Sequence, residues 1–127
     1  MTGRLVYVID DDPDMLRSTA FLLQSMGYGV ECFAEGALFL GAVPSLQPGC
    51  IVTDLRMPKV SGYDLKSALD DRSISWPVIL ITSETGSETG RDASARGFTD
   101  YLAKPFSADD LAAALDKGFA ALDEKQP

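Results

Sequence analysis

Histidine is absent from this sequence of 127 residues, and cysteine is scarce. Without an imidazole the chain lacks the usual proton shuttle and the commonest zinc ligand, which excludes hydrolase triads built on histidine. The two cysteines, Cys32 and Cys50, show neither C-x-x-C nor metal-ligand spacing, so we interpret them as small core residues. Long apolar runs are missing too: none approaches the roughly 20 residues of a membrane span, and residues 4–9 are too short a run for a signal peptide.

Positive charge is also in short supply. The chain has 11 Lys and Arg against 19 Asp and Glu, which gives a net charge of -8 and a calculated isoelectric point near 4.3. This balance argues against non-specific binding of nucleic acid or acidic membranes by the domain. The length fits one domain, which can bury roughly two-thirds of its unfolded surface. We predict a single cytoplasmic domain over residues 1–122, with residues 123–127 as a frayed tail or the start of a linker.

Apolar segments rich in β-branched residues alternate along the chain with segments of helical spacing. The strand-like segments are residues 5–9, 30–33, 50–53, 77–82 and 99–103, and the helical ones are residues 13–26, 35–43, 62–71, 86–96 and 107–122. The last helix begins with Ser107 and Asp110 at the spacing of a near capping box. Five such strand–helix units predict an α/β fold with a parallel sheet.

Acidic side chains follow two of the strands at their carboxyl ends. The first strand runs into Asp10 and Asp11, and the third runs into Asp54. Ligands collect at this edge of an open α/β sheet, and if the two strands are neighbours, about 4.8 Å apart, the three carboxylates lie close together. Like charges so close raise one another's pKa unless a cation sits among them, and oxygen ligands alone suit magnesium better than zinc or copper. A single such Asp is equally well a turn residue or a helix cap, but the combination predicts a Mg²⁺ site.

With Thr82 at the end of the fourth strand and Lys104 after the fifth, the chain resembles the receiver domain of a bacterial two-component response regulator. It is most similar to receivers of FixJ-like transcription regulators. The resemblance covers residues 4–122 and rests on residues 9–13 (IDDDP), 53–58 (TDLRMP), 61–62 (SG), 81–82 (IT) and 104–106 (KPF). It implies a five-stranded parallel sheet in the order 2-1-3-4-5 with helices on both faces. Cys32 and Cys50 would then lie about 10 Å apart on either side of the first strand, so we expect free thiols.

The resemblance also implies roles for individual residues. Asp54 is expected to be the nucleophile that accepts a phosphoryl group. Lys104 is expected to contact one phosphoryl oxygen, and Thr82 to donate its hydroxyl to another. Tyr101 is the matching aromatic switch, expected to move between exposed and buried positions, with a half-buried strand tyrosine as the plain alternative. The expected Mg²⁺ ligands are Asp10, Asp11, Asp54 and the backbone carbonyl of Arg56.

Two further residues, Arg56 and Glu84, occupy positions that in the family flank the site and tune how fast water removes the phosphoryl group. We expect them to face each other across the pocket mouth and to pair when the pocket is empty. The Lys104-Pro105 peptide bond is expected to be cis, which aims the lysine into the pocket. The fourth helix departs from the family pattern, because it has an interior Gly90 and no large apolar residue, so we expect it to be poorly anchored and mobile.

These features indicate a phosphorylation-dependent switch whose only chemistry is its own Mg²⁺-dependent phosphorylation and dephosphorylation. A sensor histidine kinase or histidine phosphotransfer protein is expected to donate the phosphoryl group, and a partner or attached output domain to read the change. A phosphorylation-dependent dimer through the face from the fourth helix to the fifth helix is an open alternative to a monomer. Two other functions are less well supported. A phosphate-independent interaction module usually lacks one or more of the acidic pair, the acceptor, the Thr and the Lys, and all five are present here. A flavin or nucleotide carrier needs a phosphate-binding glycine loop, which residues 85–87 resemble only faintly.

Overall fold

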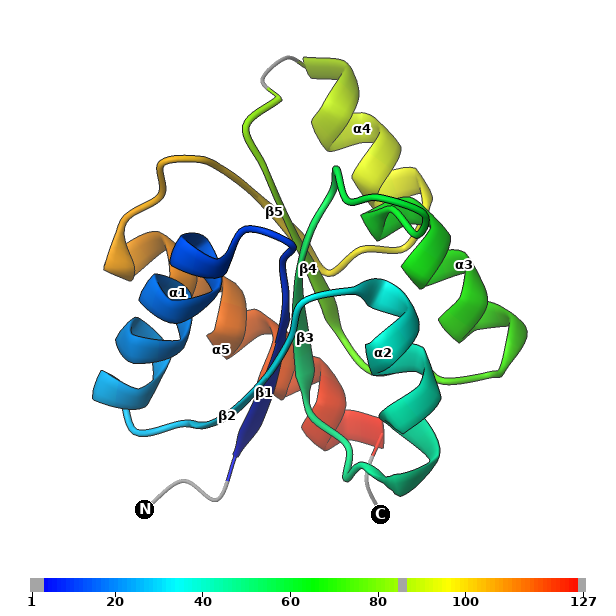
Figure 1. Ribbon diagram of the computed structural model, residues 1–127, viewed down its shortest axis with the longest axis horizontal. Coiled ribbons are helices and arrows are strands. Elements are labelled where there is room, and N and C mark those ends of the chain that lie inside the picture. The colour runs from blue at the N-terminus through cyan, green and yellow to red at the C-terminus, as the bar shows by residue number, and fades with distance from the viewer. Residues whose placement is uncertain (1–3, 85–86, 126–127) are drawn as a thin grey trace.

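The computed structural model describes residues 4–84 and 87–125, in which strands and helices alternate along the chain (Figure 1). The strands are β1 (Leu5–Ile9), β2 (Gly29–Phe33), β3 (Cys50–Asp54), β4 (Val78–Thr82) and β5 (Asp100–Ala103). The helices are α1 (Pro13–Ser25), α2 (Gly36–Ala42), α3 (Gly62–Asp71), α4 (Ser87–Ala95) and α5 (Ala108–Lys125), with the 3₁₀ turn η1 (Val43–Ser45) after α2.

The strands form one parallel sheet in the order β2-β1-β3-β4-β5, which confirms the predicted fold. In register, Val8 of β1 pairs with Cys32 of β2 on one side and with Val52 of β3 on the other. Because β1 and β3 are neighbours that run the same way, the residues that follow both strands emerge at one edge of the sheet. Parallel pairing therefore brings Asp10 and Asp54 together.

Helices cover both faces of the sheet: α1 and α5 lie on one face, and α2, α3 and α4 on the other (Figure 1). Alternate residues of each central strand point to opposite faces, so Tyr7 and Ile9 pack beneath α2 and α3, while Val6 and Val8 pack beneath α1 and α5. Both sets are buried. Double coverage is why the central strands are apolar on both sides, as parallel strands usually are.

Helix ends follow the signals in the sequence. Asp12 caps α1 by accepting a hydrogen bond from the Asp14 backbone N–H at 3.0 Å, and Gly27, at φ 96°, follows its last turn. The predicted capping box of α5 is present in both directions: the Ser107 hydroxyl accepts from the Asp110 backbone, and the Asp110 carboxylate accepts from the Ser107 backbone. These caps set where the loops at the carboxyl edge begin and end.

Two predictions are wrong in detail. Cys32 lies exposed on the edge strand β2, because an edge strand has a partner on one side only, whereas Cys50 is buried as predicted. The fifth helix continues to Lys125 instead of ending at Leu122. Asp123, which was predicted to belong to a frayed tail or the start of a linker, pairs with Arg4 at 2.9 Å, and the Arg4 guanidinium also stacks 4.7 Å from the centre of the Phe119 ring. Both cysteines are free, as expected.

The remaining boundary shifts are small. The second helix ends at Ala42, because Pro44 lies in the tighter turn η1 and not in the α-helix that was predicted to reach residue 43. The fourth helix is described from Ser87, and its predicted start at Gly86 lies outside the described residues. Within residues 4–84 and 87–125, no helix combines the length and the apolar character that crossing a membrane demands.

Candidate functional site

Asp54 is the last residue of β3, and the chain turns away from the sheet directly after it. Its carboxylate is 12% exposed, so it faces a sheltered space at the strand end. The loop that follows closes at Gly62, whose N–H donates to the carbonyl of Leu55 at 2.8 Å. A Cβ at Gly62 would lie 2.7 Å from the Asp54 carbonyl oxygen, so only glycine lets α3 begin this close to the strand.

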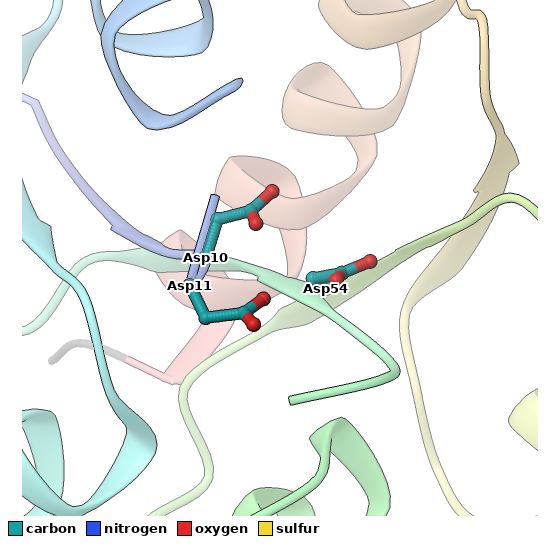
Figure 2. A group of neighbouring side chains, drawn as sticks. All are labelled: Asp10, Asp11 and Asp54. Atoms are coloured by element: carbon teal, nitrogen blue, oxygen red, sulfur yellow. The ribbon is translucent and has the colours of Figure 1, made fainter. Parts of the chain in front are cut away.

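Asp10 and Asp11 follow β1 at the same edge. The Asp10 backbone N–H donates to the Phe33 carbonyl of β2 at 3.1 Å, and the Asp10 carboxylate accepts from the Asp12 backbone at 3.0 Å. Asp10 is buried and Asp11 is exposed. Figure 2 shows the three carboxylates of Asp10, Asp11 and Asp54 directed into one region, and each offers an oxygen within 4.8 Å of the others. The predicted acidic cluster is therefore assembled by the fold.

Lys104 brings one positive charge to this cluster. Its ammonium nitrogen lies 3.2 Å from an Asp54 oxygen and 3.5 Å from an Asp10 oxygen. Burial raises the pKa of Asp10, while the Asp12 N–H and Lys104 partly offset that rise. Three carboxylates against one ammonium leave net negative charge among hard oxygen donors, which is the donor set that suits a hydrated divalent cation. The residues present therefore fit Mg²⁺.

Thr82 and Tyr101 meet at the backbone of Glu84. The Thr82 side chain, at the end of β4, is buried and accepts a hydrogen bond from the Glu84 N–H at 3.0 Å. From β5, the Tyr101 hydroxyl donates to the Glu84 carbonyl oxygen at 3.0 Å. Tyr101 is half-buried in this arrangement, and its expected movement stays a prediction. Glu84 was predicted as a side chain that tunes the pocket, and its role as a backbone junction was not anticipated.

Residues 6–116 match the family described as the response regulator receiver domain. The chain belongs to this family. It is 38% identical over 111 residues to the transcriptional regulatory protein FixJ of Bradyrhizobium diazoefficiens, an alignment that covers 87% of this chain and 54% of FixJ. It is 34% identical over 112 residues to the tetrathionate response regulatory protein TtrR of Salmonella typhimurium, covering 88% of this chain and 54% of TtrR. The receiver thus spans about half the length of these curated relatives.

Solved structures agree. The crystal structure of FixJ-N matches this receiver with a TM-score of 0.86 at 32% identity, covering 93% of this chain and 94% of that chain. Full-length FixJ from B. japonicum matches with a TM-score of 0.87 at 36% identity, covering 94% of this chain and 59% of that chain. Receivers are phosphoacceptor signalling domains of two-component systems and not conventional enzymes, and they generally bind Mg²⁺. The family and the fold that the sequence indicated are both confirmed.

Arg56 and Glu84, each two residues beyond the end of the strand that carries Asp54 or Thr82, form an ion pair. The Arg56 side chain is 70% exposed and the Glu84 side chain is 38% exposed, so water reaches both groups. The hydrogen bond from Arg56 lowers the pKa of Glu84, and the same bond raises the pKa of Arg56. The expected pairing is therefore present. The Lys104-Pro105 bond is cis, as predicted.

Sequence reasoning missed an apolar groove beside Lys104. It is lined by Met15, Ser18, Thr19, Leu22, Lys104, Pro105 and Phe106. Met15 and Leu22 are apolar residues of α1, and both are only partly buried. The available signal was their spacing of seven residues, which puts both on one face of α1, beside the face of the fully buried Leu23 and toward the loop after β5.

Proposed function

We propose that this receiver accepts a phosphoryl group on Asp54 from a sensor histidine kinase or a histidine phosphotransfer protein, in the cytoplasm. We further propose that the resulting change controls an attached output domain or a separate partner. One observation carries the assignment: the Asp54 carboxylate shares a sheltered site with Asp10, Asp11 and the Lys104 ammonium. The receiver would occupy residues 1–122, and its similarity to FixJ, a transcriptional regulatory protein, supports a transcription regulator as the longer protein.

The transfer joins a carboxylate oxygen of Asp54 to the phosphorus atom while the bond from phosphorus to a donor histidine nitrogen breaks. The electron pair of that bond stays on the imidazole nitrogen, which takes up a proton from solvent. Lys104, 3.2 Å from Asp54, holds a positive charge beside the carboxylate and contacts a phosphoryl oxygen in the product. Asp54 acts as nucleophile, and the chain needs no histidine of its own.

The residues that would hold Mg²⁺ are Asp10, Asp11, Asp54 and the backbone carbonyl of Arg56. When bound, Mg²⁺ supplies positive charge that offsets the charge developing on the phosphoryl oxygens. Asp10 and Asp11 take no part in bond making: their carboxylates orient the site, and burial keeps Asp10 in place. Because Lys104 alone cannot neutralise three carboxylates, the free site opposes the approach of an anionic phosphodonor, which makes labelling of Asp54 dependent on a cation.

Thr82 and Tyr101 would transmit the change. Once Asp54 carries a phosphoryl group, the Thr82 hydroxyl donates to one of its oxygens, and the Glu84 N–H bonded to Thr82 follows. Tyr101, held by the Glu84 carbonyl, then responds to the new position of that backbone. The Arg56–Glu84 pair stands at the entrance and tunes how fast water reaches the phosphoryl group. A dimer of the phosphorylated form through α4, β5 and α5 is a further proposal, which native mass spectrometry tests.

Intact-mass measurement tests the proposal directly. The purified chain is incubated with a small phosphodonor, with and without Mg²⁺, beside an Asp54→Asn variant. We expect one phosphoryl adduct that requires Mg²⁺ and is missing in the variant. An adduct of equal yield in Asp54→Asn would assign the acceptor to another residue. If neither the small donor nor a known kinase partner labelled the wild type, the domain would act as a phosphate-independent interaction module.

A further inference from the structure

The helix α4 is held mainly at its carboxyl end. Among its described side chains only Ala93 is buried. The helix ends at a Schellman motif, in which the Gly97 N–H donates to the Ser94 carbonyl and the Phe98 N–H donates to the Ala93 carbonyl, both at 3.0 Å. Gly97 has the positive φ, 89°, that this motif requires. Phe98, buried directly after it, ties this end into the core.

Side chains of α3 clasp the same end of α4. The Arg96 guanidinium lies 3.9 Å from the centre of the Tyr63 ring, and the Tyr63 ring lies 6.0 Å from that of Phe98. The Lys66 ammonium, which is paired with Asp70 at 2.5 Å, lies 3.2 Å from where a Cβ of Gly97 would stand. A cation there is favourably placed against the partly negative carboxyl end of the helix. The carboxyl end of α4 is thus fixed by stacking, by charge and by burial.

The amino end of α4 is connected to the acceptor site instead. Glu84 lies three positions before Ser87 in the sequence, and its backbone is bonded to both Thr82 and Tyr101. In the first half of the helix, Gly90 packs against the Tyr101 ring, which would lie 3.7 Å from a Cβ at that position. Among the described residues, the contacts near the amino end are therefore made by those expected to respond to phosphorylation, and they include no buried apolar side chain of the helix.

We propose that the stack of Arg96 on Tyr63 is the fixed end about which α4 turns when Asp54 is phosphorylated, so that the amino end moves while the carboxyl end stays against α3. This inference rests on the function proposed above. A helix moves as a rigid rod when its own hydrogen bonds persist, and a rod anchored at one end responds to a pull at the other by rotation. Gly90, Ala93 and Ser94 line a pocket together with Tyr101, which leaves the helix room to shift over that ring.

Spin-label distances test the two ends separately. Exposed positions on α4 are labelled as Glu88→Cys or Ala95→Cys, each paired with Asp71→Cys, exposed on α3, in a Cys32→Ser background. Cys50 is buried with its thiol pKa raised to about 12, so it stays unlabelled. On phosphorylation we expect the distance from 71 to 88 to shift by about 2 Å or more, and the distance from 71 to 95 to stay within about 1 Å.

Variants of the stack then test the anchor itself. Tyr63→Leu removes the ring, and Arg96→Ala removes the exposed cation without disturbing the core; in either, the phosphorylation-dependent shift should extend to position 95. Tyr63→Phe keeps the ring face, and Arg91→Ala removes another exposed arginine of α4, so both should behave like the wild type.

The outcomes separate the two proposals. Intact mass reports the adduct on Asp54 in the same samples, and its absence would overturn the proposed function together with this inference. An adduct accompanied by equal shifts at positions 88 and 95 would overturn the anchor alone. So would an unchanged distance at position 95 in both Tyr63→Leu and Arg96→Ala.

Discussion

The apolar body of the sheet and its carboxyl edge are built from the same strands, yet they have opposite character. In β1, Val6, Tyr7, Val8 and Ile9 are all buried, and the next residue is a buried carboxylate. In the body, each side chain finds apolar neighbours from the helices on both faces. At the edge, Asp10 and Asp54 share their space with a lysine instead.

The apolar body of the sheet provides stability, whereas the carboxyl edge carries the groups of the site. Burying an apolar side chain in the body contributes about 1.5–3 kcal/mol to folding. Burying Asp10 opposes folding, as its raised pKa shows, because its charged form is less well solvated than in water. The body can carry such an edge because many apolar contacts outweigh a few unfavourable charges. The edge in return keeps negative oxygens ready for a cation and a phosphoryl group.

The largest expected effect is on the free energy of unfolding, from a substitution in the apolar body of the sheet. Leu115 of α5 is fully buried, so Leu115→Ala should lower the free energy of unfolding by about 2–5 kcal/mol. Leu38→Ala makes the same chemical change on a side chain that is 55% exposed, and it should cost less than about 0.5 kcal/mol. Urea denaturation measures both. If Leu115→Ala also abolished labelling of Asp54 in the folded protein, the separation between body and edge would fail.

A second prediction concerns pH and the body. Burial raises the pKa of the Cys50 thiol to about 12 from an unperturbed 9.0. The unfolded thiol loses its proton at lower pH than the folded one. The stabilising contribution of the buried, protonated thiol to the free energy of unfolding is therefore complete below pH 9 and is lost as the pH rises toward 12. The slope should be about 1.4 kcal/mol per pH unit. Unfolding of the wild type and of Cys50→Ala between pH 8 and about 10.5 compares the two slopes, and parallel curves would contradict the prediction.

The third prediction is that a substitution at the carboxyl edge stabilises the protein, whereas the substitution in the body destabilises it. Asp10→Asn removes a charge that burial disfavours and that Asp54 and Asp11 repel, so it should raise the free energy of unfolding by about 1 kcal/mol in chelator. The same change should reduce Mg²⁺-dependent labelling about 10-fold or more. Asp116→Asn, on the exposed face of α5, is the matched control and should alter neither. A less stable Asp10→Asn would mean that its pairing with Lys104 outweighs the burial of the charge.

The smallest expected effect on stability lies at the rim of the edge. Glu84→Ala removes an exposed ion pair and should leave unfolding nearly unchanged. Loss of the phosphoryl group should become about 2- to 5-fold faster and less dependent on salt, because the Arg56 side chain no longer closes the entrance. Phosphoryl lifetimes measured at two salt concentrations, with Glu88→Ala as control, check this. An unchanged rate and salt dependence would show that the pair is not a gate.

Much of this molecule follows from local pattern. The alternation of β-type and helical segments predicts each strand and helix, because burial on one or two faces imposes a period on the chain. Caps such as Ser107 and Gly27 mark where helices begin or end, since they supply hydrogen bonds or a backbone angle that the helix end requires. The acidic residues at the strand ends, with the family resemblance, point to the phosphoacceptor chemistry.

Other properties arise only when distant segments meet. The exposure of Cys32 depends on β2 being an edge strand, and the contacts of Asp123 depend on Arg4 lying beside the end of α5. The contacts of Tyr63 and Lys66 of α3 with the carboxyl end of α4 could not be read from the composition of α4, whose expected mobility stays a prediction. The sequence by itself determined the strands and helices, their order along the chain and the chemical groups of the site. Only the tertiary structure decided which groups face one another, because those contacts depend on positions that the chain's local periodicity does not encode.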